Sequence, residues 1–367
     1  MHSTNIKYIP QVDHLRAMAA LWIVLYHSIQ LIGSVMVGGK WFSSDPWPVA
    51  SSPLTSLLIE GHSAVALFMV LSGFIFTHGT YGREICYSNF IFNRILRIYP
   101  LYLLVILLSI SASPEKFSAS DFITTILPLA DVAGLKTNAI AGMSWAVAVE
   151  FQFYLIFPFL LTSLNKSPAK TILGVILVAV IFRAIAVGHG ANPRDISYSH
   201  LIGRIDQFML GMGAAVLLRS ISEKKKTLAV LLGASTVIIV VMLYVLNRHG
   251  GWYSNSQWKI FYPMVEGTAY ALFIVSYVGT KNMIPSFIST AVTKIGEFSF
   301  SIYLLHFPIV LIFASKTALQ WHPTAYPRID LALTICLLTI PCILLVSATT
   351  YNVIERPFLS RRKKYIK

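Results

Sequence analysis

The sequence predicts an all-α protein, a polytopic bundle of about ten transmembrane helices with both termini in the cytoplasm. Of its 367 residues, 56% are hydrophobic and only 12% are charged, and the mean hydropathy is +0.68. Soluble domains carry about 25% charged residues, and here the shortage of charge extends along the whole chain. We therefore expect one integral membrane domain over residues 1–367, with a basic cytoplasmic tail at 354–367.

Ten apolar stretches are long enough to cross a bilayer, which takes about 20 helical residues. A shorter apolar piece, 121–133, contains Pro128 and two aspartates, which favours a re-entrant or interfacial segment. Connections are short, and no internal repeat is visible. The expected spans are 14–36, 54–78, 91–112, 143–164, 169–188, 199–219, 227–246, 259–279, 296–316 and 329–353.

Lysine and arginine indicate the orientation, because cytoplasmic loops carry an excess of them. The side that holds the N-terminus collects 18 of the 29 basic residues and the other side 9, while Arg16 and Arg183 lie inside spans. This bias puts both termini in the cytoplasm and Arg94 and Arg97 at the cytoplasmic end of the third span. The net charge of +14 is thus a topology signal, and we expect no nucleic-acid binding.

The first span contains VDHLRAMAALWIVLYHS, with three ionisable residues that are candidates for function because charge at membrane depth is costly. Asp13 and Arg16 lie three residues apart on one helical face and could form an interfacial ion pair. His27 follows Arg16 by eleven residues, about 16 Å along a helix. It is either a hydrogen-bonded structural histidine or a general base.

The second and third spans each contribute one motif. Ser72 and Gly73, in ALFMVLSGFIF, could be no more than a small-residue packing notch. NRILRIYPLY places Arg94 and Arg97 three residues apart on one helical face. They either anchor the topology or bind an anion, since guanidinium groups suit phosphate oxygens.

The fourth span, SWAVAVEFQFYLIFP, contains Glu150 as its only carboxylate. A lone buried glutamate needs a cation or hydrogen-bond donors to stay ionised. On the predicted topology Glu150 and His27 lie at similar depth in the outer half of the bilayer. They could form a base and its orienting carboxylate, or Glu150 could make a structural hydrogen bond.

Other ionisable residues in the spans are weaker candidates. Arg204 and Asp206, in GRIDQFMLGMG, begin the sixth span, where we expect an interfacial ion pair. His306 and Glu266 are mid-span, and the sequence offers Glu266 no obvious partner. Arg183 is expected to reach the outer interface by snorkelling.

The C-terminal end and the cysteines favour structural roles. Glu355, in VIERPF, is expected to cap the last span or to form an ion pair, and SRRKKYIK to anchor the chain on anionic lipid. Cys86, Cys336 and Cys342 show no metal-ligand spacing, so we expect no metal site. Aromatic residues of the outer loops are more consistent with an interfacial belt than with sugar stacking; they are Trp41, Phe42, Trp47, Trp252, Tyr253 and Trp258.

Taken in order, these motifs resemble the acyltransferase-3 family of integral membrane acyltransferases. VDHLRAMAALWIVLYHS is similar to its opening D-G-L-R-A…H motif, with His14 in place of the usual glycine, and LFMVLSGFIF to F-x-x-S-G-F. NRILRIYPLY resembles R-x-x-R-I-x-P, and SWAVAVEFQFYLIFP resembles S-W-S-L-x-x-E-x-x-F-Y. Weaker likenesses follow in residues 204–211, in GEFSFSIYLLHFP and in VIERPF, so the resemblance covers about residues 8 to 358.

This resemblance implies transfer of an acyl group, most often acetyl, from cytoplasmic acyl-CoA to a hydroxyl of a cell-envelope or exported carbohydrate. It marks His27 as the catalytic histidine and Glu150 as a required carboxylate. The residues assigned to donor binding are Arg94, Arg97, Ser72 and Arg16. The residues assigned to substrate binding are Trp145, Arg204, Asp206 and His306.

The resemblance further implies acetyl-CoA or another acyl-CoA as donor substrate, a carbohydrate or lipid-linked glycan as acceptor, and no permanently bound cofactor. It implies a multi-pass location in a bacterial cytoplasmic (inner) membrane. Some members add an SGNH hydrolase-like domain outside the membrane, and we expect none here because the sequence ends at Lys367. The acceptor sugar, acetyl versus succinyl, direct versus covalent transfer and the oligomeric state stay open.

The alternative function is a multi-pass transporter or flippase for a glycan or lipid-linked substrate. Its buried charges would line a substrate or proton path. Transporters commonly contain internal repeats, and none is visible in this sequence.

Overall fold

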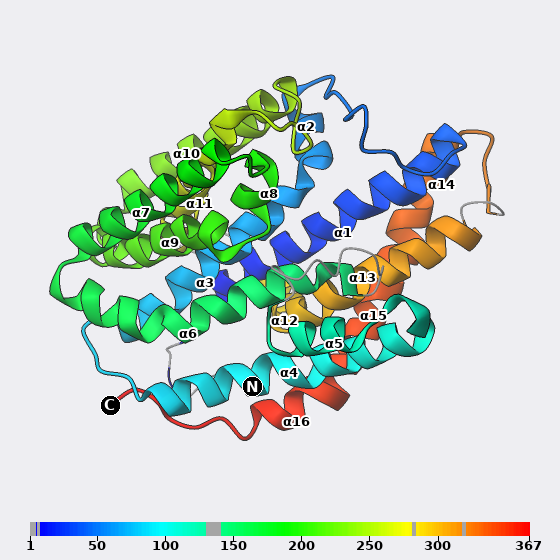
Figure 1. Ribbon diagram of the computed structural model, residues 1–367. Coiled ribbons are helices and arrows are strands. Elements are labelled where there is room, and N and C mark those ends of the chain that lie inside the picture. Colours follow the sequence, from blue (N-terminus) through cyan, green and yellow to red (C-terminus); the bar gives the residue numbers. More distant parts are fainter. Residues whose placement is uncertain (1–4, 6–7, 130–140, 281–283, 318–320) are drawn as a thin grey trace.

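The computed structural model describes residues 5, 8–129, 141–280, 284–317 and 321–367 and is 80% helical. These residues contain no strand, only an isolated bridge between Ile85 and Ile366. The predicted all-α bundle is confirmed (Figure 1). The helices are α1 Pro10–Gly38, α2 Pro53–Ile59, α3 Ala64–Thr80, α4 Tyr87–Ala112, α5 Ala119–Ile126, α6 Ser144–Lys166, α7 Pro168–Gly188, α8 Pro193–Tyr198, α9 Leu201–Ile221, α10 Lys225–Arg248, α11 Tyr262–Gly279, α12 Ser286–Glu297, α13 Ser299–Ile312, α14 Pro327–Leu333, α15 Ile340–Thr350 and α16 Arg356–Leu359.

Nine helical stretches of the described part of the chain are long and apolar enough to cross a membrane. They match nine of the ten predicted spans, and the last runs without a break through α14, α15 and α16. The remaining predicted span, 259–279, forms α11, which carries Glu266 and is not among the nine. It packs between α9 and α10 in the same bundle (Figure 1).

The short apolar piece 121–133 contributes to α5, which Ser118 and Asp121 begin with reciprocal side-chain caps. The hydroxyls of Tyr99 and Tyr102 on α4 donate to the carbonyls of Ile126 and Thr125, at 2.9 and 3.0 Å. These bonds fasten α5 along α4. Residues 130–133 lie outside the described part, and the interfacial or re-entrant placement stays a prediction.

Helices α3 and α9 make the closest contact in the core. A Cβ on Gly73 would lie 2.1 Å from the carbonyl oxygen of Phe208, and a Cβ on Gly211 would lie 2.0 Å from that of Val70. Real side chains do not approach so closely, so the two glycines let the backbones touch. The packing notch predicted at Gly73 is present, with Gly211 as its counterpart.

The two ends of the chain meet on one side of the bundle. Asn5 donates to the carbonyl of Lys363 at 3.1 Å and accepts from the backbone N–H of Tyr365 at 2.8 Å. Asn93, near the start of α4, also exchanges two hydrogen bonds with Lys363. Both termini therefore lie on the same side, as the charge count predicts. That this side faces the cytoplasm stays a prediction. Three residues of the charge count, Lys7, Lys136 and Lys281, lie outside the described part.

We expect Gly73→Ala to destabilise the protein by about 1–3 kcal/mol or more, because the added methyl group must push α3 and α9 apart. The control is Gly174→Ala on α7, where a Cβ meets nothing within 4 Å. Thermal unfolding of the purified variants in detergent measures both. Equal midpoints for the two variants would contradict this account of the contact.

Candidate functional site

A cavity of about 230 Å³ opens between α1, α3, α4, α6 and α13 and the C-terminal tail. Its wall contains the four arginines Arg16, Arg94, Arg97 and Arg362 and three carboxylates, those of Asp13, Glu150 and Glu297. The residues that the sequence assigned to donor binding thus gather around one space; they are Arg16, Ser72, Arg94 and Arg97.

Two of these arginines are neutralised by carboxylates. Arg16 pairs with Asp13 at 3.2 Å, as the spacing predicted. Arg97 pairs with the buried Glu355 at 2.9 Å, which makes Glu355 a partner for a cavity residue and not a helix cap. Both arginine side chains stay partly exposed.

The other two arginines have no carboxylate partner among the described residues. Arg94 lies over the ring of Phe76 at 4.7 Å, and its buried Nε has no hydrogen-bond partner. The Nε of Arg362 is likewise buried and unpaired. Burial, together with the charges of Arg94 and Arg97, lowers the pKa of Arg362 to about 9. Arg362 still carries its charge at neutral pH, so the cavity holds positive charge that an anion would relieve.

Sequence reasoning missed Arg362 because it assigned the tail to lipid anchoring. The structure instead folds the tail back over the start of α4. Asn89 and Asn93 hold it there by side-chain bonds to Lys364 and Lys363. No local pattern in SRRKKYIK distinguishes the arginine that enters the cavity from its exposed neighbours.

Glu150 faces the same cavity and accepts hydrogen bonds from two hydroxyls. Ser72 on α3 donates to its Oε1 at 2.8 Å, and Tyr154, one helical turn further along α6, donates to the same oxygen. These donors supply the compensation that a lone intramembrane carboxylate requires. They also fix the Ser72 and Tyr154 side chains in the cavity wall.

His27 pairs with His306 and not with Glu150, so the expected His27–Glu150 contact does not form. Nδ1 of His27 lies 3.0 Å from Nε2 of His306. The two helices that carry them, α1 and α13, pack side by side, whereas Glu150 is engaged by α3 and by its own helix. Matching depth in the bilayer, the basis of the prediction, does not specify which faces of two helices meet.

The hydrogen bonds of His306 assign the protons of this histidine pair. Its Nδ1 lies 2.7 and 3.0 Å from the carbonyls of Tyr303 and Ile302, so Nδ1 carries the hydrogen. Nε2 of His306 is then the acceptor, and Nδ1 of His27 must donate to it. In this neutral arrangement Nε2 of His27 keeps a free lone pair that can accept a proton.

The histidine pair lies just beyond the cavity wall. Tyr303 lines the cavity, and its ring lies 5.9 Å from that of His306, one helical turn further along α13. Arg16 on α1 also lines the cavity, and His27 follows it by eleven residues. His27 is therefore offset from Arg16 by about 16 Å along α1.

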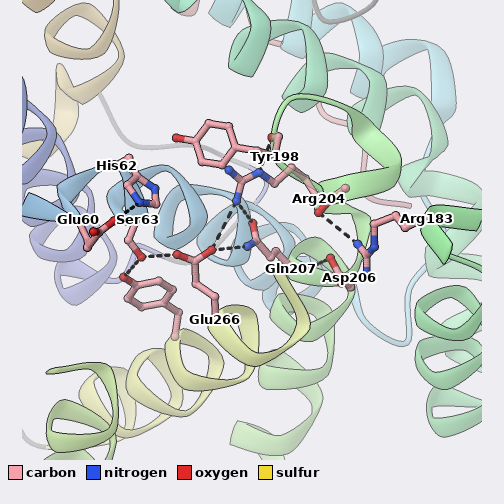
Figure 2. Close-up of polar contacts among 11 residues, drawn as sticks. Glu60, His62, Ser63, Arg183, Tyr198, Arg204, Asp206, Gln207 and Glu266 are labelled. Atoms are coloured by element: carbon pink, nitrogen blue, oxygen red, sulfur yellow. Dashed lines mark hydrogen bonds and ion pairs between the residues drawn. The ribbon is translucent and has the colours of Figure 1, made fainter. Parts of the chain in front are cut away.

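At the other end of the bundle, two buried ion pairs correct the predicted Arg204–Asp206 pair (Figure 2). Arg204 lies 3.5 Å from Glu266, and Arg183 lies 2.8 Å from Asp206. Residues two apart on a helix point in different directions, which explains why Arg204 and Asp206 find separate partners. The prediction that Arg183 snorkels is wrong, because its guanidinium is buried against Asp206. Glu266, for which the sequence offered no obvious partner, has one in Arg204 on α9.

Trp145, assigned to substrate binding, belongs to this end of the bundle. Its ring lies 5.0 Å from that of Tyr198, and the guanidinium of Arg204 lies 4.0 Å from the Tyr198 ring. Trp145 and Arg204 are thus brought together, whereas Asp206 turns away toward α7 and His306 pairs with His27.

A buried carboxylate–histidine pair was also missed. Glu60, which is fully buried, accepts from Nε2 of His62 at 2.9 Å and also from Trp47, Asn247 and the backbone N–H of Trp252. The only available signal was the presence of both residues in IEGHSA, inside a predicted span.

Comparison with known proteins agrees with the motifs. The acyltransferase-3 family, described as an acyltransferase domain, matches residues 9–348. The chain belongs to this family. O-acetyltransferase OatA from the NCTC 8325, COL and MRSA252 strains of Staphylococcus aureus is 25% identical over 395 residues, covering 98% of this chain and 58% of the relative. The chain thus spans a little over half the length of these relatives. No solved structure matches it.

We expect Asp206→Asn to destabilise the protein by about 3–5 kcal/mol, because it leaves the fully buried guanidinium of Arg183 without its counter-charge. The double variant Arg183→Met/Asp206→Leu should recover most of this loss. Unfolding midpoints in detergent compare the wild type with these two variants. The control is Lys367→Gln, which removes an exposed ion pair. A double variant no better than Asp206→Asn would show that the pair itself is not the cause.

Proposed function

We propose that this chain is a membrane O-acyltransferase that moves an acyl group, most often acetyl, from acyl-CoA to a hydroxyl of an envelope or exported carbohydrate. Membership of an acyltransferase family and relatives named O-acetyltransferase support the reaction class. The observation that carries the proposal is the cavity with two unpaired arginines, Arg94 and Arg362, beyond whose wall lies a histidine with a free lone pair.

In this proposal the phosphates of acyl-CoA bind Arg94 and Arg362, with Arg16 and Arg97 adding their exposed guanidinium edges. Unpaired guanidinium groups suit phosphate oxygens because each presents several N–H donors in one plane. The acyl-bearing arm extends along the wall formed by Ser72 and Tyr154, whose hydroxyls Glu150 orients. Its thioester then reaches the region behind Tyr303, next to His27.

Nε2 of His27 takes the proton from the acceptor hydroxyl as the hydroxyl oxygen attacks the thioester carbon. A new C–O ester bond forms, the C–S bond breaks, and CoA leaves with the proton that His27 took. His306 holds His27 in the required tautomer through the hydrogen bond between them. In this scheme Glu150 positions hydroxyls of the donor channel, and it does not touch the base.

We expect Arg94→Gln and Arg362→Gln each to weaken CoA binding about tenfold, the loss of one charge-assisted hydrogen-bonding group. Arg361→Gln is the matched control, because it removes the same charge from an exposed neighbouring position in the tail. Isothermal titration of the detergent-purified protein with CoA gives the affinities. Arg94→Gln and Arg362→Gln binding CoA as tightly as Arg361→Gln would overturn the donor site.

We expect His27→Gln to lower acyl transfer by at least about a hundredfold, the scale of general-base catalysis, while CoA binding is unchanged. The control is His249→Gln at an exposed position. Transfer is followed with radiolabelled acetyl-CoA and glycans from the producing cells, and mass spectrometry identifies the acetylated product. Glycans that cross a reconstituted bilayer without gaining acyl mass would identify a transporter or flippase instead.

A further inference from the structure

A second, small cavity lies at the opposite end of the bundle from the arginines. It has a volume of about 20 Å³, room for a single hydroxyl-sized group. Residues from α8, α9, α11 and the loop after α10 surround it, together with His62 at the start of α3. Figure 2 shows His62, Tyr198, Arg204 and Glu266 converging on this region.

Five buried polar atoms in the wall of this small cavity have no hydrogen-bond partner. Thirteen such atoms occur in the described part of the chain. The five are Nδ1 of His62, Oγ of Ser197, one terminal nitrogen of Arg204, Nε1 of Trp252 and the hydroxyl of Tyr262. Buried polar atoms without partners are costly and rare in native proteins, so their concentration at one place indicates that something polar binds there.

The same feature marks the arginine cavity, where Arg94, Arg362, His78 and Tyr365 each have an unpartnered buried atom. The two cavities together therefore hold nine of the thirteen atoms. Only four such atoms lie elsewhere in the part of the chain that the structure describes, so the unpartnered polar groups are concentrated at the two cavities.

The chemistry of the five atoms fits hydroxyl groups. Trp252 and Arg204 offer only donors, whereas the hydroxyls of Ser197 and Tyr262 donate or accept. The carboxylate of Glu60 accepts from Nε2 of His62, so Nδ1 of a neutral His62 is an acceptor. A sugar hydroxyl both donates and accepts, and so matches this mixed set.

Charges around the small cavity balance. Arg204 lies 3.5 Å from Glu266, and Arg194 lies 3.0 Å from Asp195. The third cation, Lys259, donates to the backbone carbonyl of Trp252, and Glu60, 2.9 Å from His62, supplies the third carboxylate. Three cations and three carboxylates leave no net attraction for an anion. The rings of Tyr198 and Trp252, 5.4 Å apart, add an apolar wall suited to the C–H face of a sugar.

The small cavity and the arginine cavity lie on opposite sides of the histidine pair. The ring of Tyr26 lies 4.8 Å from that of His27 and 6.1 Å from that of His62. His62, in the helical turn Gly61–Ser63 that leads into α3, precedes Ser72 of the arginine cavity by ten residues, about 15 Å. His27 is therefore flanked by the arginine cavity toward one end of the bundle and by the small cavity toward the other.

We propose that the small cavity bounded by His62, Ser197, Arg204, Trp252 and Tyr262 binds one hydroxyl group of a neutral carbohydrate acceptor. The identification of this ligand as an acceptor rests on the proposed acyl transfer. The outer-loop residue Trp252 then contributes to a sugar site and is more than part of an aromatic belt.

Tyr262→Phe and Ser197→Ala test this site, because each removes only a hydroxyl that has no partner in the protein and so leaves folding intact. The probes are methyl glycosides of common hexoses and the glycan fraction of the producing cells. Binding is followed by tryptophan fluorescence without CoA, since Trp252 lines the cavity and Trp145 packs against Tyr198, which also lines it. Each variant should bind about fivefold more weakly than the wild type, one hydrogen bond's worth, with CoA affinity unchanged. Tyr326→Phe, at an exposed position, is the matched control.

Two results would overturn the carbohydrate site. One is wild-type protein that binds no probe up to its solubility limit. The other is binding that neither Tyr262→Phe nor Ser197→Ala weakens, which would mean that the five atoms hold water only. Carbohydrate binding that the two variants weaken, in a protein that transfers no acetyl group, would support this site while refuting the proposed transferase activity. Acetyl transfer by a protein whose carbohydrate binding neither variant weakens would refute this site while supporting the proposed transferase activity.

Discussion

An apolar bundle must neutralise every charge that it buries, and this constraint organises the molecule. Arg183–Asp206, Arg204–Glu266 and Arg97–Glu355 each join residues of different helices, and they are among the most deeply buried charges of the described residues. A buried pair adds little net stability, but loss of one partner is severe. Such pairs therefore specify which helix faces meet. Against this background the uncompensated guanidinium groups of Arg94 and Arg362 are exceptional, and they occur together.

The helical fold was predictable because it depends on local properties of the sequence. Apolar length locates a span, and the span boundaries agree with the helices to within a few residues at most positions. The pair Asp13–Arg16 was predictable for the same reason, since three residues of helix determine its geometry. α11 shows the limit of this approach. Glu266 makes α11 less apolar than its neighbours. The bundle can bury this carboxylate because Arg204 on α9 matches its charge.

The candidate site was predictable only in part, because its contacts join residues far apart in the chain. His27 and His306 are separated by 279 positions, and Arg97 and Glu355 by 258. Motif order identified His27, Glu150 and the arginines as a set of candidate site residues, but it did not indicate which of them are in contact. Similar depth in the bilayer suggested that His27 lies beside Glu150. The rotation of each helix about its axis instead directs His27 to His306 and Glu150 to Ser72. Arg362 and the Glu60–His62 pair could not be distinguished from an anchoring tail and an apolar span without the tertiary fold.

The geometry of α1 constrains any donor that this protein uses. Arg16 and His27 lie on one continuous helix, which fixes their separation at about 16 Å, the distance between the proposed anion-binding end and the proposed base. A compact acyl phosphate could not occupy both ends at once, because its phosphate and its acyl carbon are adjacent. Acyl-CoA has phosphates and thioester at opposite ends of a long flexible arm. His62 lies on the far side of Tyr26 from His27, so in the proposed reaction the acceptor approaches from the other end. The proposal thus has donor and acceptor meet at His27 without sharing an entrance, which would keep the hydrolysable thioester away from water on the acceptor side.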